Sequence, residues 1–389
     1  MTNLIDLTDV SEAAIDCPVY LINNTEQLNE ISTHWFNKKV LAIDTEFERR
    51  TTYYAKLALV QVYDGDAIYI IDPLTAECPD SLREVFLNPK IKKILHSSKE
   101  DLEVLYTAWN CKIFNLFDTQ VAYNFLHGEL SIGYAKLVKE ITGIFIDKQE
   151  TNSNWLKRPL KVQQLHYAAN DVRHLIEICQ SLEKELLTKD YSAYFLLECI
   201  EYCEAAYFKV DSLPDYRDAK DCWQLDKFEL ALFKQIFYWR EKVAKSTDRT
   251  KNHIIRDNEI VQLIKMRATS VEQIKSIKDI HPRSIRLFAG EWIKLIANWN
   301  KAEKIAMPIV LNPRDVNNLK PFATLLESSV KVIAKKNHLP LTLLLSKRII
   351  KKLALSLLTA TKAPIQWQGW RKDLLNETVK EQLNQFTKI

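Results

Sequence analysis

Short apolar runs and longer amphipathic segments follow one another through the first half of the chain. Four apolar runs have the length and composition of strands and predict strands at 40–43, 57–63, 67–71 and 91–96. Apolar residues at three- and four-residue steps predict helices at 25–36, 99–109, 118–125, 133–141, 163–187 and 191–210. Asp64-Gly65, between the second and third runs, is typical of a hairpin turn. This order predicts an α/β domain in which helices flank a sheet.

Beyond this domain the pattern is almost purely helical. A linker is predicted at 211–215, where Asp, Ser and Pro interrupt the periodicity. Helical spacing returns at Leu225, Phe228, Leu232, Ile236 and Trp239, and again between Ile285 and Trp299. A further helical region runs from about residue 308 to the end. We therefore predict an α/β domain at 1–212, followed by two small all-α bundles at 213–304 and 305–389.

Five residues suited to metal and proton chemistry lie on these elements: Asp44, Glu46, Asp101, Tyr167 and Asp171. If the strand at 40–43 continues, alternation places Asp44 and Glu46 on one face. Tyr167 and Asp171 are four residues apart on a helix and so share one side of it. Mg²⁺ prefers carboxylate oxygens, and a tyrosine beside it can orient an attacking water. Together the five predict a magnesium-dependent nuclease site.

Each of these motifs by itself also fits a structural role. An Asp-x-Glu after a buried strand is commonly a solvated loop or a helix cap. Ser98-Lys99-Glu100-Asp101 has the composition of an ordinary helix start, where acids complement the helix dipole. Tyr167 and Asp171 also fit the polar flank of a helix beside its core stripe. The nuclease interpretation depends on the joint occurrence of all the motifs in order.

The surrounding residues form a longer set of motifs. They lie at 41–47, 52–54, 57–61, 71–74, 95–96, 100–104, 118–120, 155–160 and 167–172. In order and spacing they resemble ribonuclease D of the DEDD exonucleases, in the branch whose third motif contains tyrosine. The resemblance covers about residues 20–210. It continues more weakly in 239–244 and 255–257, which resemble the helicase-and-RNase-D C-terminal (HRDC) module, and in 343–353 and 369–371, which resemble a diverged second copy.

The resemblance implies an RNase H-like mixed sheet and a site for two divalent metal ions, Mg²⁺ or alternatively Mn²⁺. By this resemblance Asp44, Glu46 and Asp171 hold one ion, and Asp44 is shared with the second. Asp101 supports the second ion, and Tyr167 positions the attacking water. The implied reaction is hydrolysis of RNA from its 3′ end with release of nucleoside 5′-monophosphates.

Three further residues are candidates for binding the substrate. The resemblance assigns Phe47 and Lys148 to the terminal nucleotide, although Lys148, between Asp147 and Glu150, also fits a solvated lysine. His96, at the predicted end of a strand, either contacts a phosphate or satisfies neighbouring backbone groups, and we favour the structural role. The eight histidines and seven cysteines show none of the spacings typical of a zinc site.

Charge is distributed unevenly along the chain, although the net charge is only +4. Residues 1–200 contain 20 Lys and Arg against 29 Asp and Glu, whereas 251–389 contain 25 against 11. An acidic half repels a polyanion unless cations bind, and a basic tail can capture phosphates and steer them to the site. The alternative is that the basic residues only solubilise helices.

Composition is that of a globular protein, with 47% hydrophobic residues. The N-terminus lacks a basic segment of the secretory type, and no stretch approaches eighteen consecutive apolar residues. Seven scattered cysteines, an odd number, fit a reducing compartment. We therefore expect a cytoplasmic protein with no membrane association and no obligate protein partner.

The expected function is that of a 3′→5′ exoribonuclease that matures precursor tRNA and other small structured RNAs at their 3′ ends. The residues alone predict metal-dependent phosphodiester cleavage, whereas polarity, RNA preference and tRNA processing come from the resemblance. Two alternatives remain open. One is a DNA 3′→5′ exonuclease with the same carboxylates, and the other is a non-catalytic RNA-binding scaffold, against which the clustered carboxylates argue.

Overall fold

The computed structural model describes residues 4–7, 17–129, 131–146, 153–219, 221–301, 316–361, 363–364 and 366–387. The described chain forms two compact units. The first comprises residues 1–48, 56–208 and 318–389, and the second comprises 49–55 and 209–317. The predicted boundary at 212/213 lies near the start of the second unit, and the one at 304/305 lies outside the described residues. The three-domain division therefore stays a prediction.

A mixed sheet forms the centre of the first unit. Within the described residues its strand order is β1-β2-β5-β4-β3-β6-β7. The strands are β1 Ile5–Asp6, β2 Val19–Ile22, β3 Val40–Glu48, β4 Lys56–Tyr63, β5 Ile68–Ile71, β6 Lys92–Leu95 and β7 Leu116–Asp118. The interior strand β3 pairs antiparallel with β4 and parallel with β6. The predicted mixed sheet is thus confirmed.

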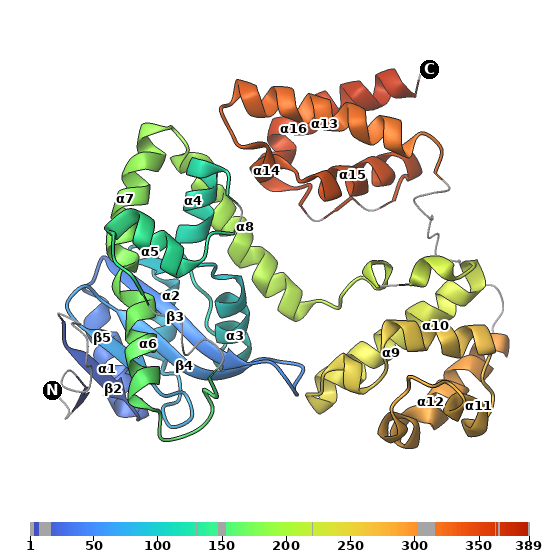
Figure 1. Cartoon of the computed structure of the whole chain (residues 1–389), viewed down its shortest axis with the longest axis horizontal. Coiled ribbons are helices and arrows are strands. Elements are labelled where there is room, and N and C mark those ends of the chain that lie inside the picture. The colour runs from blue at the N-terminus through green and yellow to red at the C-terminus, as the bar shows by residue number, and fades with distance from the viewer. Residues whose placement is uncertain are drawn as a thin grey trace. The chain divides into compact units, whose positions relative to one another are not determined.

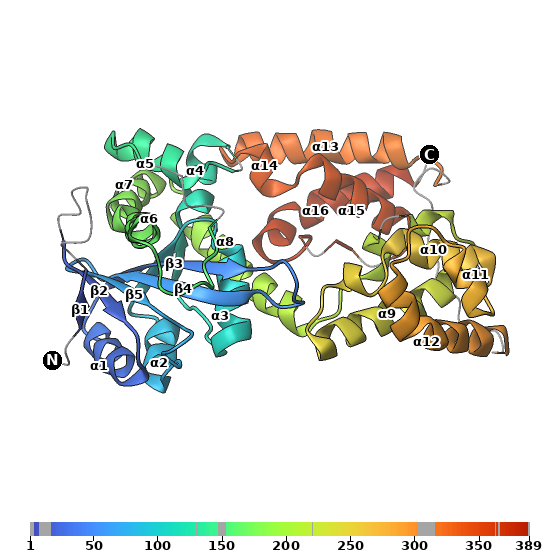
Figure 2. The same cartoon turned by 60° about the horizontal axis from the view of Figure 1, so that its bottom comes forward.

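Helices cover both faces of this sheet. They are α1 Thr25–Trp35, α2 Asp80–Leu87, α3 Lys99–Trp109, α4 Thr119–His127, α5 Tyr134–Thr142, α6 Val162–Arg173, α7 Leu175–Thr188 and α8 Ser192–Asp211. Figure 2 shows α1 and α2 on one face and α6 and α7 on the other. A sheet covered on both sides needs apolar residues on both faces of its strands. Accordingly Leu41, Ala42 and Ile43, consecutive in β3, are all fully buried.

Most predicted elements of this unit agree with the structure to within one or two residues, but one predicted helix is wrong. Residues 163–187 form two helices, α6 and α7, which are separated at His174. The break allows α6 to lie on β3, β4 and β5 while α7 packs on α4. The sequence pattern did not reveal β1, β2, β7 and α2. β1 and β7, of two and three residues, and the two-turn α2 are too short to show a period.

The predicted hairpin at Asp64-Gly65 joins β4 to β5 as expected. The Asp64 carboxylate accepts hydrogen bonds from the backbone N–H groups of Asp66 and Ala67, both at 2.9 Å. Gly65 has φ +95°, a conformation that a side chain would strain. The turn therefore needs both of these residue types.

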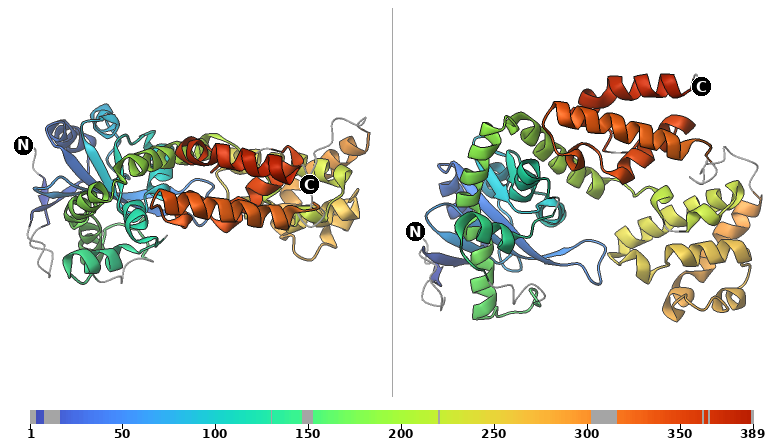
Figure 3. Two further views of the ribbon diagram at one scale, coloured as in Figure 1. Left: turned by 90° about the horizontal axis from the view of Figure 1, so that it is seen from above. Right: turned by 45° about the horizontal axis from the view of Figure 1, so that its top comes forward.

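Four C-terminal helices also belong to the first unit. They are α13 Leu319–Lys336, α14 Leu341–Leu344, α15 Lys347–Thr359 and α16 Gly369–Phe386, and they pack side by side in orange to red in both views of Figure 3. At the start of α16, the Arg371 guanidinium and the Trp370 indole N–H donate to the Glu198 carboxylate on α8. Glu198 and Trp370 are buried. A desolvated charge pair thus attaches these helices to α8.

The second unit is helical. Its helices are α9 Lys227–Thr247, α10 Asp257–Met266, α11 Val271–Lys275 and α12 Pro282–Lys301 (Figure 1). They enclose an apolar core that includes Phe233, Ile260 and Trp292. Buried Arg240 donates to Asp257 and Glu241 and so has partners for its charge. No helix in the described parts of the chain has the length and apolar content needed to span a membrane.

We predict that replacing Glu198 by Ala lowers the free energy of unfolding by about 3 kcal/mol, because it leaves the Arg371 charge partly unpaired among buried groups. Glu201, 3.1 Å from the same guanidinium, keeps the loss at the lower end of the range for buried pairs. Urea unfolding measures this difference. The matched control is Glu183→Ala, which breaks the exposed Lys92–Glu183 pair and should cost less than about 1 kcal/mol. Equal losses in the two variants would contradict the role of Glu198.

Candidate active site

Asp44 and Glu46 lie on one face of β3 because the strand continues past the apolar run to Glu48. Asp44 is opposite Gln61 of β4, and Glu46 is opposite Leu59. The register of this pairing shifts between Glu46 and Phe47, which marks an irregularity of the bulge type. Bulges commonly re-aim side chains next to functional sites. The two acids therefore share one face of β3, as strand alternation predicts, and the regular pairing of the strand ends directly after Glu46.

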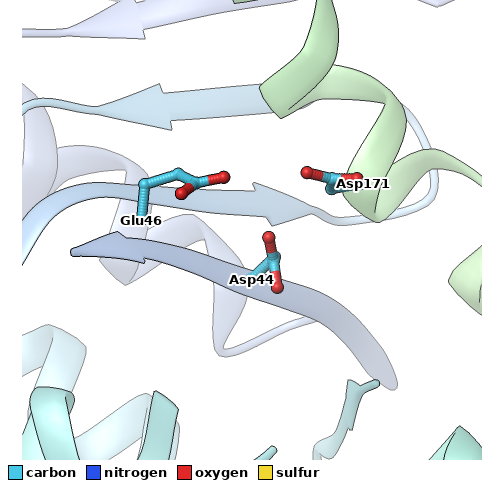
Figure 4. A group of neighbouring side chains, drawn as sticks. All are labelled: Asp44, Glu46 and Asp171. Carbon is cyan, nitrogen blue, oxygen red and sulfur yellow. The ribbon is translucent and has the colours of Figure 1, made fainter. Parts of the chain in front are cut away.

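Asp171 reaches the same place from α6. This helix buries Ala168, Ala169 and Val172, and it packs on β3, β4 and β5. Small alanine side chains allow a helix to approach a sheet closely. One carboxylate oxygen from each of Asp44, Glu46 and Asp171 lies within 4.8 Å of the others. Figure 4 shows the three carboxylates converging from the strand and the helix.

Asp101 is the third residue of α3, and its carboxylate is buried. The Thr45 hydroxyl donates a hydrogen bond to it from between the two acids of β3. The group of three carboxylates does not include Asp101, yet its charge repels those of Asp44, Glu46 and Asp171. Asp101 is therefore a neighbour of the group at somewhat greater distance.

Tyr167 lies one helical turn before Asp171, and its hydroxyl donates a hydrogen bond to the Asp171 carboxylate. Its ring packs against the indole of Trp155, with 5.8 Å between ring centroids. The segment that carries Trp155 is held by Arg158, whose Nη1 donates to the Trp155 carbonyl at 2.7 Å and whose Nη2 donates to Asp72 at 2.7 Å. The phenol is therefore fixed at both its ring and its hydroxyl.

Burial raises the pKa of every carboxylate of this site, and repulsion among the acids adds to the effect for Asp44, Glu46 and Asp171. Burial raises the pKa of Glu46 to about 9, and repulsion from Asp171 and Asp101 adds to the effect. Burial raises the pKa of Asp171 to about 8 despite the hydrogen bond from Tyr167. The pKa of Asp101 rises to about 7 through burial, opposed by the Thr45 hydrogen bond. Burial and three neighbouring acids also raise the pKa of Asp44 well above its usual range. Such a cluster holds its full negative charge only beside a cation.

The donor set fits a hard divalent cation. Three carboxylate oxygens converge within the span of one coordination sphere, and their mutual repulsion is relieved when a positive ion lies between them. The arrangement contains oxygen ligands only, as Mg²⁺ and Mn²⁺ prefer. Asp44, Glu46 and Asp171 are the residues that would hold it.

The three candidate substrate residues differ in their surroundings. Phe47 is half-buried at the irregular end of β3. The His96 ring is hydrogen-bonded at both nitrogens, to the Thr119 hydroxyl at 2.9 Å and to the Ile132 carbonyl at 3.1 Å. This geometry supports the structural role of His96. Lys148 lies outside the described residues, so its assignment stays a prediction.

Two residues near the carboxylates were not identified from the sequence. Thr45 donates a hydrogen bond to the Asp101 carboxylate. From the sequence, strand alternation indicates only that the Thr45 side chain points away from Asp44 and Glu46. Tyr134, the first residue of α5, donates to the Asn170 carbonyl at 3.0 Å, and burial together with the charges of Asp171 and Asp44 raises its pKa. No local pattern distinguishes Tyr134, because only tertiary packing brings α5 to α6.

Family models match two parts of the chain. A 3′-5′ exonuclease model matches residues 19–187, which carry all five predicted site residues. An HRDC domain model matches residues 229–296, within the second unit. Among solved structures, the catalytic core of RRP6 from Trypanosoma brucei has a TM-score of 0.59 at 21% identity and covers 74% of this chain and 81% of its own, a likeness that concerns the fold alone.

Closer relatives align over nearly their whole length. Ribonuclease D of Pseudomonas paraeruginosa is 31% identical over 364 residues, which are 92% of this chain and 96% of that protein. The crystal structure of Escherichia coli RNase D, described as an exoribonuclease involved in structured RNA processing, has a TM-score of 0.86 at 27% identity and covers 94% of this chain and 98% of its own. From this full-length similarity, the exonuclease and HRDC matches and the carboxylate site, we conclude that the chain belongs to the ribonuclease D family of 3′–5′ exoribonucleases.

Proposed function

We propose that this exoribonuclease hydrolyses RNA at the site of Asp44, Glu46 and Asp171, with two divalent ions, Mg²⁺ in preference to Mn²⁺. Asp44 would contribute to both ions, and Asp101 would support the second one. When bound, the ions stabilise the charge that develops on the attacking and leaving oxygens. The observation that carries the proposal is the convergence of three carboxylate oxygens within 4.8 Å beside a fixed tyrosine.

Tyr167 positions the attacking water. The Tyr167 hydroxyl donates to the Asp171 carboxylate, and a phenol oxygen that donates one hydrogen bond can also accept one, as from a water molecule. Packing on Trp155 restricts the ring, so this acceptor stays in one place. A water held in this way presents its own lone pair to the terminal phosphodiester. Phe47 and Lys148 are assigned to the terminal nucleotide.

The substrate that we propose is the 3′ end of precursor tRNA and of other small structured RNAs. Support comes from the relative in Escherichia coli, which is described as acting in structured RNA processing. The body of such an RNA also needs a surface of positive charge. Exposed Lys335, Lys336, Lys347, Arg348 and Lys351 lie on α13 and α15, in the same compact unit as the carboxylates. We assign the RNA body to this surface, defined as the α13–α15 basic surface.

We expect purified protein to shorten a 5′-labelled precursor tRNA with a short 3′ trailer one nucleotide at a time in Mg²⁺, and not in EDTA. Asp44→Asn should lower the rate by more than about 100-fold, because even partners outside the metal's own ligand shell contribute 10–100-fold. A denaturing gel time course measures both.

The same substrate made of DNA is the control for the sugar. Preferential loss of the DNA strand would favour the DNA exonuclease alternative. Full activity of Asp44→Asn, in a preparation free of other nucleases, would contradict the site assignment.

In EDTA, the carboxylate cluster should make the fold less stable as pH rises. Glu46 titrates near 9 in the folded chain against an ordinary value of 4.5, so the folded state holds more protons between these limits and its free energy of unfolding falls across pH 5–9. In Asp44→Asn, the decrease in the free energy of unfolding across this pH range should be smaller by about 1–3 kcal/mol, since one pKa unit corresponds to about 1.4 kcal/mol. Urea unfolding at pH 5.5, 7 and 8.5 measures the slope.

Mg²⁺ should reverse the trend in the unchanged protein, with greater stabilisation at pH 8.5 than at pH 5.5, because protons compete with the metal. The Asp44→Asn variant should lose most of this response. A metal-free stability that rises with pH equally in both proteins would be inconsistent with the repulsion.

Neutralising the α13–α15 basic surface should weaken RNA binding. In Lys347→Gln/Lys351→Gln, two exposed cations four residues apart on α15 are lost, so the slope of log affinity against log salt should become shallower by about 2. Filter binding of precursor tRNA between 50 and 200 mM salt measures the slope, with Lys90→Gln/Lys184→Gln, two exposed lysines of the sheet domain, as control. Substitution is preferable to truncation because Trp370 and Arg371 pack on α8. Equal slopes in the two variants would contradict the assignment of this surface.

A further inference from the structure

The turn between β6 and α3 determines where Asp101 lies. It consists of His96, Ser97 and Ser98, and α3 begins at the next residue. Ser97 has φ +59°, a left-handed conformation that costs a non-glycine residue free energy. Ser98 is fully buried, and its carbonyl accepts from the backbone N–H of Leu102 at 2.9 Å. Because Asp101 lies in the first turn of α3, any displacement of this turn moves its carboxylate.

A buried aspartate of a different element holds this turn. Asp118, the last residue of β7, is fully buried and accepts five hydrogen bonds. One oxygen accepts from the N–H and the hydroxyl of Ser98, each at 2.7 Å. The other accepts from the N–H groups of Ser97, Gln120 and Val121, at 3.2, 2.9 and 3.1 Å. A single carboxylate therefore caps α4 and binds the strained turn before α3.

The second attachment of Asp101 is independent of this one. Thr45 of β3 donates to the Asp101 carboxylate directly, whereas Asp118 acts on the backbone that carries it. The two attachments come from strands on either side of β6, because β3 and β7 are its neighbours in the sheet. They fix both the side chain and the helix start. A carboxylate that supports a catalytic ion needs such support, since a displacement of about 1 Å can cost about 100-fold in rate.

We propose that Asp118 is a positioning residue for the exonuclease reaction, which acts through the 96–98 turn to place Asp101. This inference rests on the role given to Asp101 under Proposed function. Asn is the informative substitution, because it has nearly the same shape but only one acceptor oxygen. Whichever way the amide is turned, at least two of the five donors then face an NH₂ group.

The test combines Asp118→Asn, Asp101→Asn and the double variant in the full chain. Asp118→Asn should lower kcat on the trailer substrate about 10- to 100-fold, leave KM for RNA within about twofold, and raise the Mg²⁺ concentration for half-maximal rate. Calorimetric titration of Mn²⁺ into the RNA-free protein should show correspondingly weaker binding. In the Asp101→Asn background, Asp118→Asn should add less than about a threefold loss, because its effect passes through Asp101.

The matched control is Asp64→Asn. Asp64 is another buried aspartate that accepts from two backbone N–H groups, at the end of the sheet where β3 begins. It should lower thermal stability without changing kcat, KM or the Mg²⁺ requirement. Ser98→Ala removes only one of the five donors of Asp118, and is the second variant if Asp118→Asn fails to fold. It should lower kcat about threefold, and this effect too should vanish in the Asp101→Asn background.

The outcomes distinguish the role of Asp118 from the role of Asp101. A multiplicative loss in the double variant, or lower stability with unchanged kcat and metal binding, would overturn the positioning role while leaving the site intact. Normal kcat and metal binding in Asp118→Asn, together with an inactive Asp101→Asn, would likewise overturn the positioning role of Asp118. Full activity of Asp101→Asn would instead contradict the role of Asp101 itself, and with it the role of Asp118.

Discussion

Mutual repulsion among half-buried carboxylates is the constraint on which the rest of this structure depends. Asp44, Glu46 and Asp171 bring their oxygens within 4.8 Å of one another, and Asp101 adds its charge close by. Like charges at this spacing in partly desolvated surroundings destabilise the fold in the absence of a cation. The framework must therefore hold together a group that would otherwise separate.

The framework does this with rigid elements and small side chains. Asp44 and Glu46 belong to β3, an interior strand that β6 pairs with at Val40–Ala42 and that β4 pairs with at the two acids themselves. Ala168 and Ala169 allow α6 to lie against that sheet, which brings Asp171 to the two strand residues. Arg158, bound to Asp72, fixes the segment that carries Trp155, and Trp155 supports Tyr167. Preorganisation of this kind holds the carboxylates and Tyr167 in place in the absence of substrate.

Charge is separated along the chain in a way that suits the reaction. The acidic residues are concentrated in the half that forms the carboxylate site, and the basic residues in the C-terminal part. The last four helices nevertheless belong to the same compact unit as the site and are attached to α8 through Glu198 and Arg371. The α13–α15 basic surface and the carboxylate site are thus parts of one compact unit, although they are far apart in the sequence.

The sequence by itself determined the class of the fold and the helical C-terminal part, and it predicted five candidate site residues, of which the structure groups Asp44, Glu46 and Asp171. It did so because strand alternation and helix periodicity are local, and because Asp44 with Glu46, and Tyr167 with Asp171, are each close in sequence. Tertiary structure alone decided that α6 and α7 separate at His174, that Thr45 supports Asp101 and that Asp118 holds the turn before it. These contacts join β3 to α3, and β7 to the β6–α3 turn, across 20 or more residues. No short-range pattern can specify such contacts, since only packing of the sheet brings the partners together.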